Sequence, residues 1–245
     1  MLSRRATYRP YRRELAQDRL QVLQRGVSWI DELQFIVVLL GPKNVGKTSL
    51  TATFTKGRYH HLDLDPHEFI YETQELVDNE IAPLQIMDTR TGEESRLCLE
   101  DMATTLQVGE GFIIVYSITD RDSFEDAKRF QSLLHQVRKT KDVPIVLVGN
   151  KNDLTEEREV TIKEGRDLAF QIGCSFYEVS AHLGIDNVRK IFHDVVRQIR
   201  AVNDYKATLE KKRRHRMNST KKFIHRYLLC NGLRAHHRDP FRDDW

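Results

Sequence analysis

A glycine-rich segment that also holds a lysine and a threonine is where the residue types point most directly to chemistry. Residues 41–48 read Gly-Pro-Lys-Asn-Val-Gly-Lys-Thr and fit the pattern GxxxxGK[ST]. They follow the apolar run 35–40 and precede an amphipathic stretch that begins at Leu50. In that setting the backbone N–H groups bind phosphate, Lys47 contacts the β- and γ-phosphates, and the Thr48 hydroxyl is a ligand of Mg²⁺. The segment predicts a nucleoside triphosphate site.

A second polar segment identifies the base. Residues 150–153 read Asn-Lys-Asn-Asp and come directly after the apolar run 145–148. The Asp153 carboxylate can accept hydrogen bonds from N1–H and the exocyclic amine of guanine, a pattern that adenine does not present, while the Lys151 stem covers the ring. Ser-Ala at 180–181 follows another apolar run, where a backbone N–H can reach the guanine O6. The two segments together predict guanine specificity.

The elements that would position these segments alternate between apolar strands and amphipathic helices. This alternation predicts an α/β fold with a six-stranded, mostly parallel, doubly wound sheet and helices on both faces. A polar turn at Asp78-Asn79 predicts a hairpin that adds one antiparallel edge strand. The expected strands are 35–40, 75–78, 84–87, 112–116, 145–148 and 175–179, and the expected later helices are 123–138, 162–171 and 187–200.

Charge divides the 245-residue chain into three parts. The net charge of +3 combines seven Arg against four acids in residues 1–34, 20 basic residues against 28 acids in the middle, and twelve against four in residues 205–245. We therefore expect a basic N-terminal extension (1–33), one domain (34–203) and a basic tail (204–245) that is disordered or helical on contact. No apolar run approaches the roughly 18 residues of a membrane span. Three cysteines without paired spacing support neither a disulfide framework nor a structural zinc site.

With these motifs the sequence resembles the Ras superfamily of small GTPases over about residues 35–200. The segments 109–124 and 143–151 extend the similarity. The stretch 120–180, the basic tail and the lack of a C-terminal prenylation box are most like the Rerg and RasL branch. The resemblance implies a P-loop NTPase G domain that is a monomer, binds GTP or GDP with Mg²⁺, hydrolyses GTP and meets effector and regulator proteins of unknown identity.

The resemblance also implies roles for individual residues. Lys47, Gly92 and Glu93 would be catalytic, and Thr48 and Asp88 would hold Mg²⁺, with Asp88 acting through water. The residues that would bind GTP are Gly41, Lys43, Asn44, Val45, Gly46, Lys47, Thr48, Ser49, Asp88, Asn150, Lys151, Asp153, Ser180, Ala181 and His182.

The sequence departs from the family at the positions that would contact the γ-phosphate. His67 stands where the family has a Mg²⁺-binding threonine, Gly92 comes one residue late after Asp88, and Glu93 replaces the glutamine that orients the attacking water. Lys43 occupies a position that is usually glycine. An ionised carboxylate only accepts hydrogen bonds and repels phosphate oxygens, so we expect slow hydrolysis. The alternative is a pseudo-GTPase scaffold that binds nucleotide without switching.

The basic tail predicts where the protein resides. The sequence ends Asp-Pro-Phe-Arg-Asp-Asp-Trp245, so we expect no prenyl anchor. The Lys/Arg-rich segment 211–226 would attach reversibly to an anionic membrane or be recognised by a nuclear import receptor. We expect a cytoplasmic protein with a minor membrane-associated or nuclear pool.

Overall fold

A computed structural model of the protein describes residues 34–57, 70–89, 99–139 and 142–235. These ranges contain one six-stranded sheet, five α-helices and one 3-10 helix. The strands are β1 (Phe35–Leu40), β2 (Ile70–Val77), β3 (Glu80–Asp88), β4 (Gly111–Ser117), β5 (Ile145–Asn150) and β6 (Ser175–Glu178). The helices are α2 (Lys47–Lys56), α3 (Leu99–Val108), α4 (Arg121–Arg138), α5 (Ile162–Ile172) and α6 (Ile185–Ala235), and the 3-10 helix η2 is Thr155–Glu157.

The sheet has the order β2-β3-β1-β4-β5-β6, in which only β2 and β3 pair antiparallel. Asp78 and Asn79 form the predicted turn, with φ of 53° and 65°, a backbone conformation that Asn and Asp tolerate better than most residues. The predicted edge hairpin is therefore confirmed. Both of its strands are longer than expected, because pairing continues from Val77 and Glu80 out to Ile70 and Met87.

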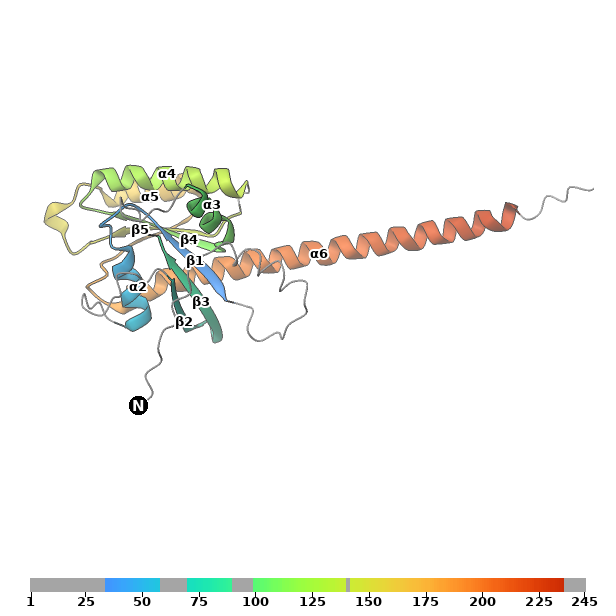
Figure 1. The fold of residues 1–245 in the computed structure, drawn as a ribbon, viewed down its shortest axis with the longest axis horizontal. Coiled ribbons are helices and arrows are strands. Elements are labelled where there is room, and N and C mark those ends of the chain that lie inside the picture. The colour runs from blue at the N-terminus through green and yellow to red at the C-terminus, as the bar shows by residue number, and fades with distance from the viewer. Residues whose placement is uncertain (1–33, 58–69, 90–98, 140–141, 236–245) are drawn as a thin grey trace, which may run out of the picture. The chain divides into compact units, whose positions relative to one another are not determined.

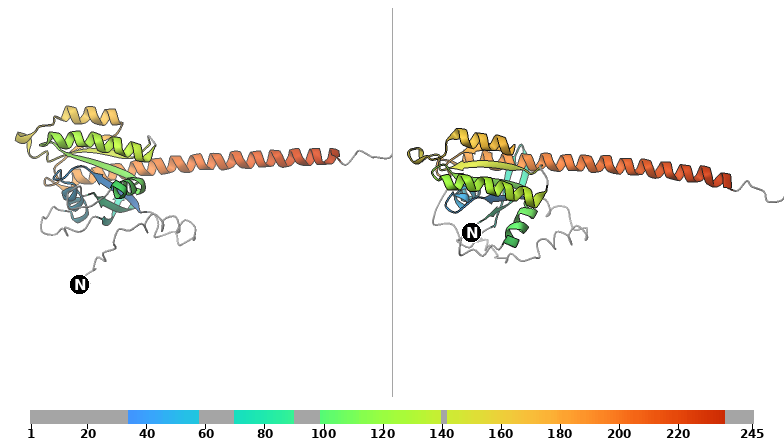
Figure 2. Two further views of the ribbon diagram at one scale, coloured as in Figure 1. Left: turned by 45° about the horizontal axis from the view of Figure 1, so that its top comes forward. Right: turned by 90° about the horizontal axis from the view of Figure 1, so that it is seen from above.

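Successive residues of the strands supply two hydrophobic cores, one on each face of the sheet. Helices cover both faces (Figures 1 and 2). Val37 and Leu39 pack with buried residues of α2 and of the first part of α6. Val38 and Leu40 pack on the other face, with residues of α3, α4 and α5. This alternation follows from the period of two in a strand, and it confirms the doubly wound fold with helices on both faces.

Two helices differ from the predictions. The apolar pattern did not predict α3, whose middle carries Thr104 and Thr105, residues of low helix propensity. The final helix was expected to end at Arg200, with the tail disordered or helical on contact, but α6 continues to Ala235. No proline and no glycine before Gly232 interrupt α6, and its Lys, Arg, Glu and Leu residues favour helix without apolar packing.

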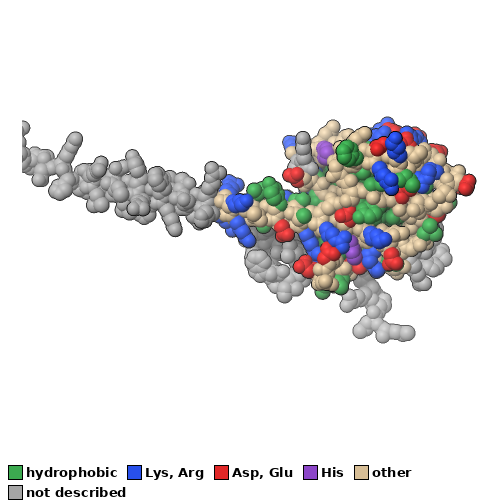
Figure 3. Space-filling view, turned by 180° about the vertical axis from the view of Figure 1, so that it is seen from behind, with side chains coloured by type: hydrophobic (Ala, Val, Ile, Leu, Met, Phe, Trp, Pro, Cys, Tyr) green, Lys and Arg blue, Asp and Glu red, His purple; other side chains and the backbone are tan. Residues whose placement is uncertain are grey.

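Contacts divide the chain into two compact units, one up to Ile199 and one from Arg200 onwards. On the face of the first unit that Figure 3 shows, basic and acidic side chains are interspersed. Some of them form ion pairs between elements, such as Arg197 with Asp78. In the second unit, Lys211–Arg214 are exposed. None of the helices in the described part of the chain combines the length and apolarity needed to cross a bilayer.

Candidate functional site

The phosphate-binding motif forms the loop between β1 and α2. Gly46 has a φ of 94°, and a Cβ atom there would lie 2.2 Å from the Asn150 side-chain nitrogen, so only glycine fits. Asn44 also has a positive φ, 62°, which is uncommon for a residue with a side chain. Gly46 is the N-cap of α2 and has no side chain to cap the amides of the first turn, and that turn contains no acidic residue. A helix N-terminus of this kind is suited to an anionic ligand.

The positions within this loop differ in exposure. Lys43 and Asn44 are exposed, whereas Gly41 and Val45 are buried, and Ser49 is intermediate. A Cβ atom on Gly41 would lie 2.3 Å from the Val115 carbonyl oxygen, so this end of the loop is held close to β4.

Lys47 and Thr48 are the first two residues of α2. The Lys47 ammonium group is buried and donates to the carbonyl oxygens of Gly41 and Pro42, at 2.8 and 2.7 Å. The Thr48 hydroxyl donates to Asp88 Oδ2 at 2.5 Å. Asp88 ends β3 and is 2 % exposed. The structure thus brings the two predicted Mg²⁺ residues together, and their hydroxyl and carboxylate oxygens are donors that a hard divalent cation prefers.

These two oxygens do not make a metal site by themselves. No group of three or more His, Cys, Asp or Glu side chains that could hold a metal occurs among the described residues. A Mg²⁺ ion there would need oxygens from a nucleotide and from water to complete its shell, which is its usual mode of binding in phosphate sites.

Asn150, at the end of β5, connects the phosphate loop to the base loops. Its side-chain nitrogen donates to the Val45 carbonyl at 2.8 Å, and its side-chain oxygen accepts from the Ala181 amide at 3.2 Å. Both bonds are buried and join residues that are far apart in the sequence. Thr53 of α2 adds a third connection, donating to the Ala181 carbonyl at 2.9 Å. Thr53 was not among the predicted site residues. Its hydroxyl on the buried face of an amphipathic helix was the signal that could have indicated a buried hydrogen bond.

The predicted base-binding residues follow β5 and β6, at neighbouring carboxyl ends of parallel strands. Lys151 has a φ of 65°, and residues held in such sparsely populated conformations tend to cluster at functional sites. Asp153 is exposed, so its carboxylate is accessible to a ligand. Ser180 and Ala181 are buried, whereas His182 is exposed. An exposed carboxylate beside a buried backbone segment can recognise the polar edge of a flat ligand.

Comparison with known proteins agrees with this geometry. The family described as the Ras family matches residues 36–201. The chain belongs to the Ras family. GTP-binding protein Rit2 of Mus musculus is 41% identical over 181 residues, which cover 73% of this chain and 81% of Rit2. The Ras-related and estrogen-regulated growth inhibitor of Homo sapiens is 38% identical over 165 residues, covering 67% and 80%. GTP-binding protein GEM of Homo sapiens is 40% identical over 179 residues, covering 72% of this chain but only 59% of GEM.

The resemblance predicted from the motifs is therefore confirmed: the chain is a Ras-family GTP-binding protein with the G-domain fold. The family implies binding of GTP or GDP together with Mg²⁺. The prediction of slow hydrolysis depends on His67, Gly92 and Glu93. These residues lie outside the part of the chain that the structure describes.

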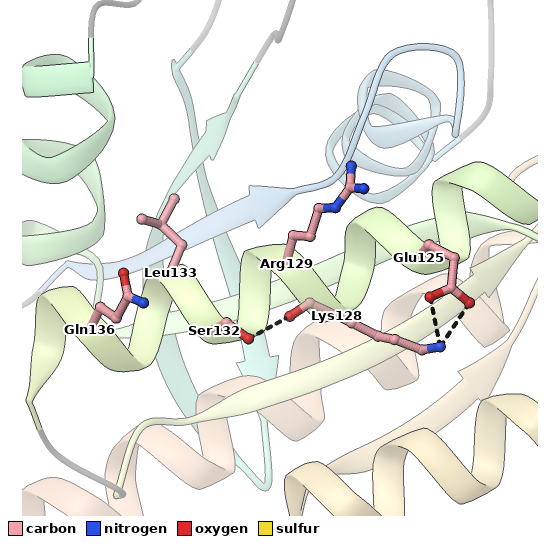
Figure 4. A pocket seen from close by; sticks show the side chains of 6 residues that line it. All are labelled: Glu125, Lys128, Arg129, Ser132, Leu133 and Gln136. Atoms are coloured by element: carbon pink, nitrogen blue, oxygen red, sulfur yellow. Dashed lines mark hydrogen bonds and ion pairs between the residues drawn. The ribbon is translucent and has the colours of Figure 1, made fainter.

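A shallow hollow of about 460 Å³ on this Ras-family protein runs along α4 (Figure 4). Its lining residues are Glu125, Lys128, Arg129, Ser132, Leu133 and Gln136. Lys128 is bonded to both carboxylate oxygens of Glu125, at 2.7 and 2.8 Å, and Ser132 donates to the Lys128 carbonyl. None of these residues belongs to the loops described above, so the hollow is separate from the candidate nucleotide site.

Proposed function

We propose that the protein is a guanine-nucleotide switch whose G domain, residues 34–203, binds GTP or GDP with Mg²⁺ and engages a protein partner when GTP is bound. The supporting observation is the Asn150 side chain, which bonds to the phosphate loop at Val45 and to the base loop at Ala181. One side chain thereby couples the segments that would hold the two ends of a nucleotide. When bound, Mg²⁺ would neutralise phosphate charge beside Thr48 and Asp88.

Each part of the site has its own task in this proposal. The loop amides and Lys47 hold the phosphates, and Lys47 turns from the carbonyls of Gly41 and Pro42 toward them. Asp153 accepts from the N1–H and amine of guanine, and the Ala181 N–H, which donates to the Asn150 side-chain oxygen at 3.2 Å, is shared with O6 when the base is bound. Lys151 covers the ring face. A bound adenine would cover the Asp153 carboxylate without offering it a donor at N1 or C2, and a covered carboxylate without a partner is penalised, so adenine would bind poorly.

Titration with fluorescent GTP, GDP and ATP analogues tests the proposal. We expect guanine nucleotides to bind far more tightly than ATP, and Asp153→Ala to remove most of that preference. Equal affinity for ATP, or an Asp153→Ala variant that binds GTP as the wild type does, would refute the assignment of the base site.

Slow hydrolysis is the finer part of the proposal and depends on the sequence departures. Glu93 lacks the hydrogen-bond donor of a glutamine, and at the family's catalytic position it would add negative charge near the γ-phosphate. Gly92 is displaced by one residue, and His67 replaces a Mg²⁺-binding threonine. Lys43 is exposed at the loop, where its charge would neutralise phosphate or obstruct an incoming arginine finger.

These same departures favour a second candidate function, a pseudo-GTPase scaffold that holds nucleotide without hydrolysing it or switching. Nucleotide content after gentle purification, together with single-turnover hydrolysis of bound GTP, separates the two. A measurable rate that depends on Mg²⁺ supports the slow enzyme. Bound GTP that persists unchanged through the assay supports the scaffold.

Location and partners form the last part of the proposal. The basic segment 211–226 would give weak contact with an anionic membrane or an import receptor, while most of the protein stays in the cytoplasm as a monomer. Each Lys or Arg near an anionic leaflet contributes about 1 kcal/mol, so attachment would be reversible and sensitive to salt. The effector and regulators would be recognised by the nucleotide-dependent segments of the G domain.

A further inference from the structure

The segment that carries Asp153 is anchored at both ends to one residue, Glu178, at the end of β6. At the start of the segment, the Asn152 side-chain amide donates to the Glu178 carbonyl at 3.3 Å. At the far end, beyond η2, the two terminal nitrogens of Arg158 donate to the two carboxylate oxygens of Glu178, each at 2.9 Å. Asp153 lies between these anchors.

The ion pair between Arg158 and Glu178 has the geometry of a strong contact. It is bidentate, with both oxygens engaged, and the side chains are only 21% and 11% exposed. Arg158 also donates to the Val160 carbonyl at 3.0 Å, which fixes the guanidinium plane. The hydrogen bonds to Glu178 raise the pKa of Arg158 above its ordinary value. A planar guanidinium held in this way cannot be replaced by lysine without losing geometry.

Glu178 also orients the second base loop. It directly precedes Val179, whose amide donates to the Gly149 carbonyl at 2.9 Å and whose carbonyl accepts from the Asn152 amide at 3.1 Å. Ser180 and Ala181 follow at once. The loop with Asp153 and the loop with Ala181 therefore share one anchoring point.

We infer that Arg158 and Glu178 are positioning residues for guanine recognition: their ion pair holds Asp153 in line with the base while contacting no part of the nucleotide. This inference rests on the proposed function. Without the pair, the loop would remain attached to β6 through Asn152, and the amides of Glu159 and Val160 would still donate to the Ile118 carbonyl at 2.8 and 3.0 Å. The tie between Arg158 and β6, which lies between these attachments and Asp153, would be lost. Asp153 would then lose the alignment that lets one carboxylate accept from both N1–H and the exocyclic amine.

Another bidentate ion pair in the same unit provides the matched control. Arg197 of α6 donates to both carboxylate oxygens of Asp78 at 2.7 and 2.6 Å, with exposures of 50% and 53%. It joins α6 to the β2–β3 turn and contacts neither base loop. Arg197→Gln therefore removes a bidentate contact that is more exposed, and it leaves the Asp153 segment in place.

The experiment compares release of fluorescent GDP and fluorescent inosine diphosphate, whose base lacks the exocyclic amine, from the full chain in Mg²⁺. The variants are Arg158→Gln, Glu178→Gln, their double variant and the control Arg197→Gln. We expect each single substitution near the base to speed GDP release about tenfold, the order of one charge-assisted hydrogen bond. The double variant should be no faster than the singles, because one contact is lost in all three.

Release of inosine diphosphate should accelerate less, so that the preference for guanine falls. A contact that only stabilises the fold would change both rates equally or neither. Thermal unfolding in saturating GDP checks that each variant is folded, and Arg158→Lys, which keeps the charge but not the planar fork, serves if Arg158→Gln does not fold. We expect Arg197→Gln to release both nucleotides at the wild-type rates.

The outcomes separate this inference from the proposed function. A wild type that binds neither nucleotide overturns both. A wild type that binds GDP, with variants that release both nucleotides at unchanged or equally raised rates, overturns the positioning role alone. A reduced guanine preference in Arg158→Gln and Glu178→Gln, but not in Arg197→Gln, supports it.

Discussion

Replacing Tyr116 with phenylalanine should stabilise the protein, although it removes a polar group. Tyr116 lies in β4 with its side chain fully buried, and its hydroxyl has no hydrogen-bond partner within the part of the chain that the structure describes. Burial, and then the charge of Glu178, raise the pKa of this phenol. The ring packs edge-on against Phe124, with centroids 5.0 Å apart, and Tyr116→Phe keeps that contact.

The expected gain follows from these features. An unsatisfied buried polar group costs about 1–3 kcal/mol. The oxygen-sized void left by the substitution offsets a few tenths of a kcal/mol, at about 24 cal/mol per Å³. A net stabilisation of about 1 kcal/mol should raise the Tm by roughly 2–4 °C in a domain of this size. Thermal unfolding followed by circular dichroism, at equal GDP and Mg²⁺ concentrations, measures the difference.

Tyr177 provides the control, since its hydroxyl donates to Asp194 Oδ2 at 3.2 Å. Tyr177→Phe removes a made hydrogen bond and should lower the free energy of unfolding by about 0.5–1.5 kcal/mol. The two substitutions delete the same atom, so their opposite signs test the argument directly. A Tyr116→Phe variant that melts below the wild type would mean that the Tyr116 hydroxyl has a partner, and the reasoning would be wrong.

Three further predictions address catalysis, pH and location. Glu93→Gln should raise the single-turnover rate of GTP hydrolysis, because it would supply the hydrogen-bond donor that the family's glutamine offers to the attacking water; an unchanged rate would point to Gly92 or His67 instead. Hydrogen bonds from Thr161 lower the pKa of Glu164 to about 2, so its contribution to stability is complete above the unfolded value near 4.5 and is lost as pH falls toward 2. Urea unfolding from pH 5 to 2 should therefore show a smaller pH dependence in Glu164→Gln. Truncation after Asp204 should abolish any salt-sensitive binding to anionic vesicles. Vesicle binding that survives truncation would show that the tail is not the segment that binds the membrane.

The fold was predictable because its signals are local. The run at residues 35–40 is apolar throughout and reads as a buried strand, and the turn residues Asp78 and Asn79 mark the hairpin. The end of α6 was not predictable from falling apolar density, since helix propensity alone continues past Arg200. The spacing of apolar residues predicts a helix that buries one face, and a helix surrounded by solvent does not have that spacing.

The motifs and the family resemblance proposed the members of the candidate site but not how they connect. The Asn150 bond to Val45 joins residues 105 positions apart, and the Arg158 pair with Glu178 joins residues 20 positions apart. Such contacts depend on which strands become neighbours in the sheet. No local sequence pattern predicts that Thr48 lies next to Asp88. The two residues meet because β1, which leads into α2, pairs with β3.

The two bonds of Asn150 have a genetic consequence. Both end on backbone atoms, the Val45 carbonyl and the Ala181 amide, which are present whatever side chains those positions carry. A second substitution at either partner therefore cannot restore what a change of Asn150 removes. Suppressors of an Asn150 defect should arise elsewhere, in residues that tighten the loops by other contacts, and exchanges at Val45 or Ala181 that preserve packing should leave this connection intact.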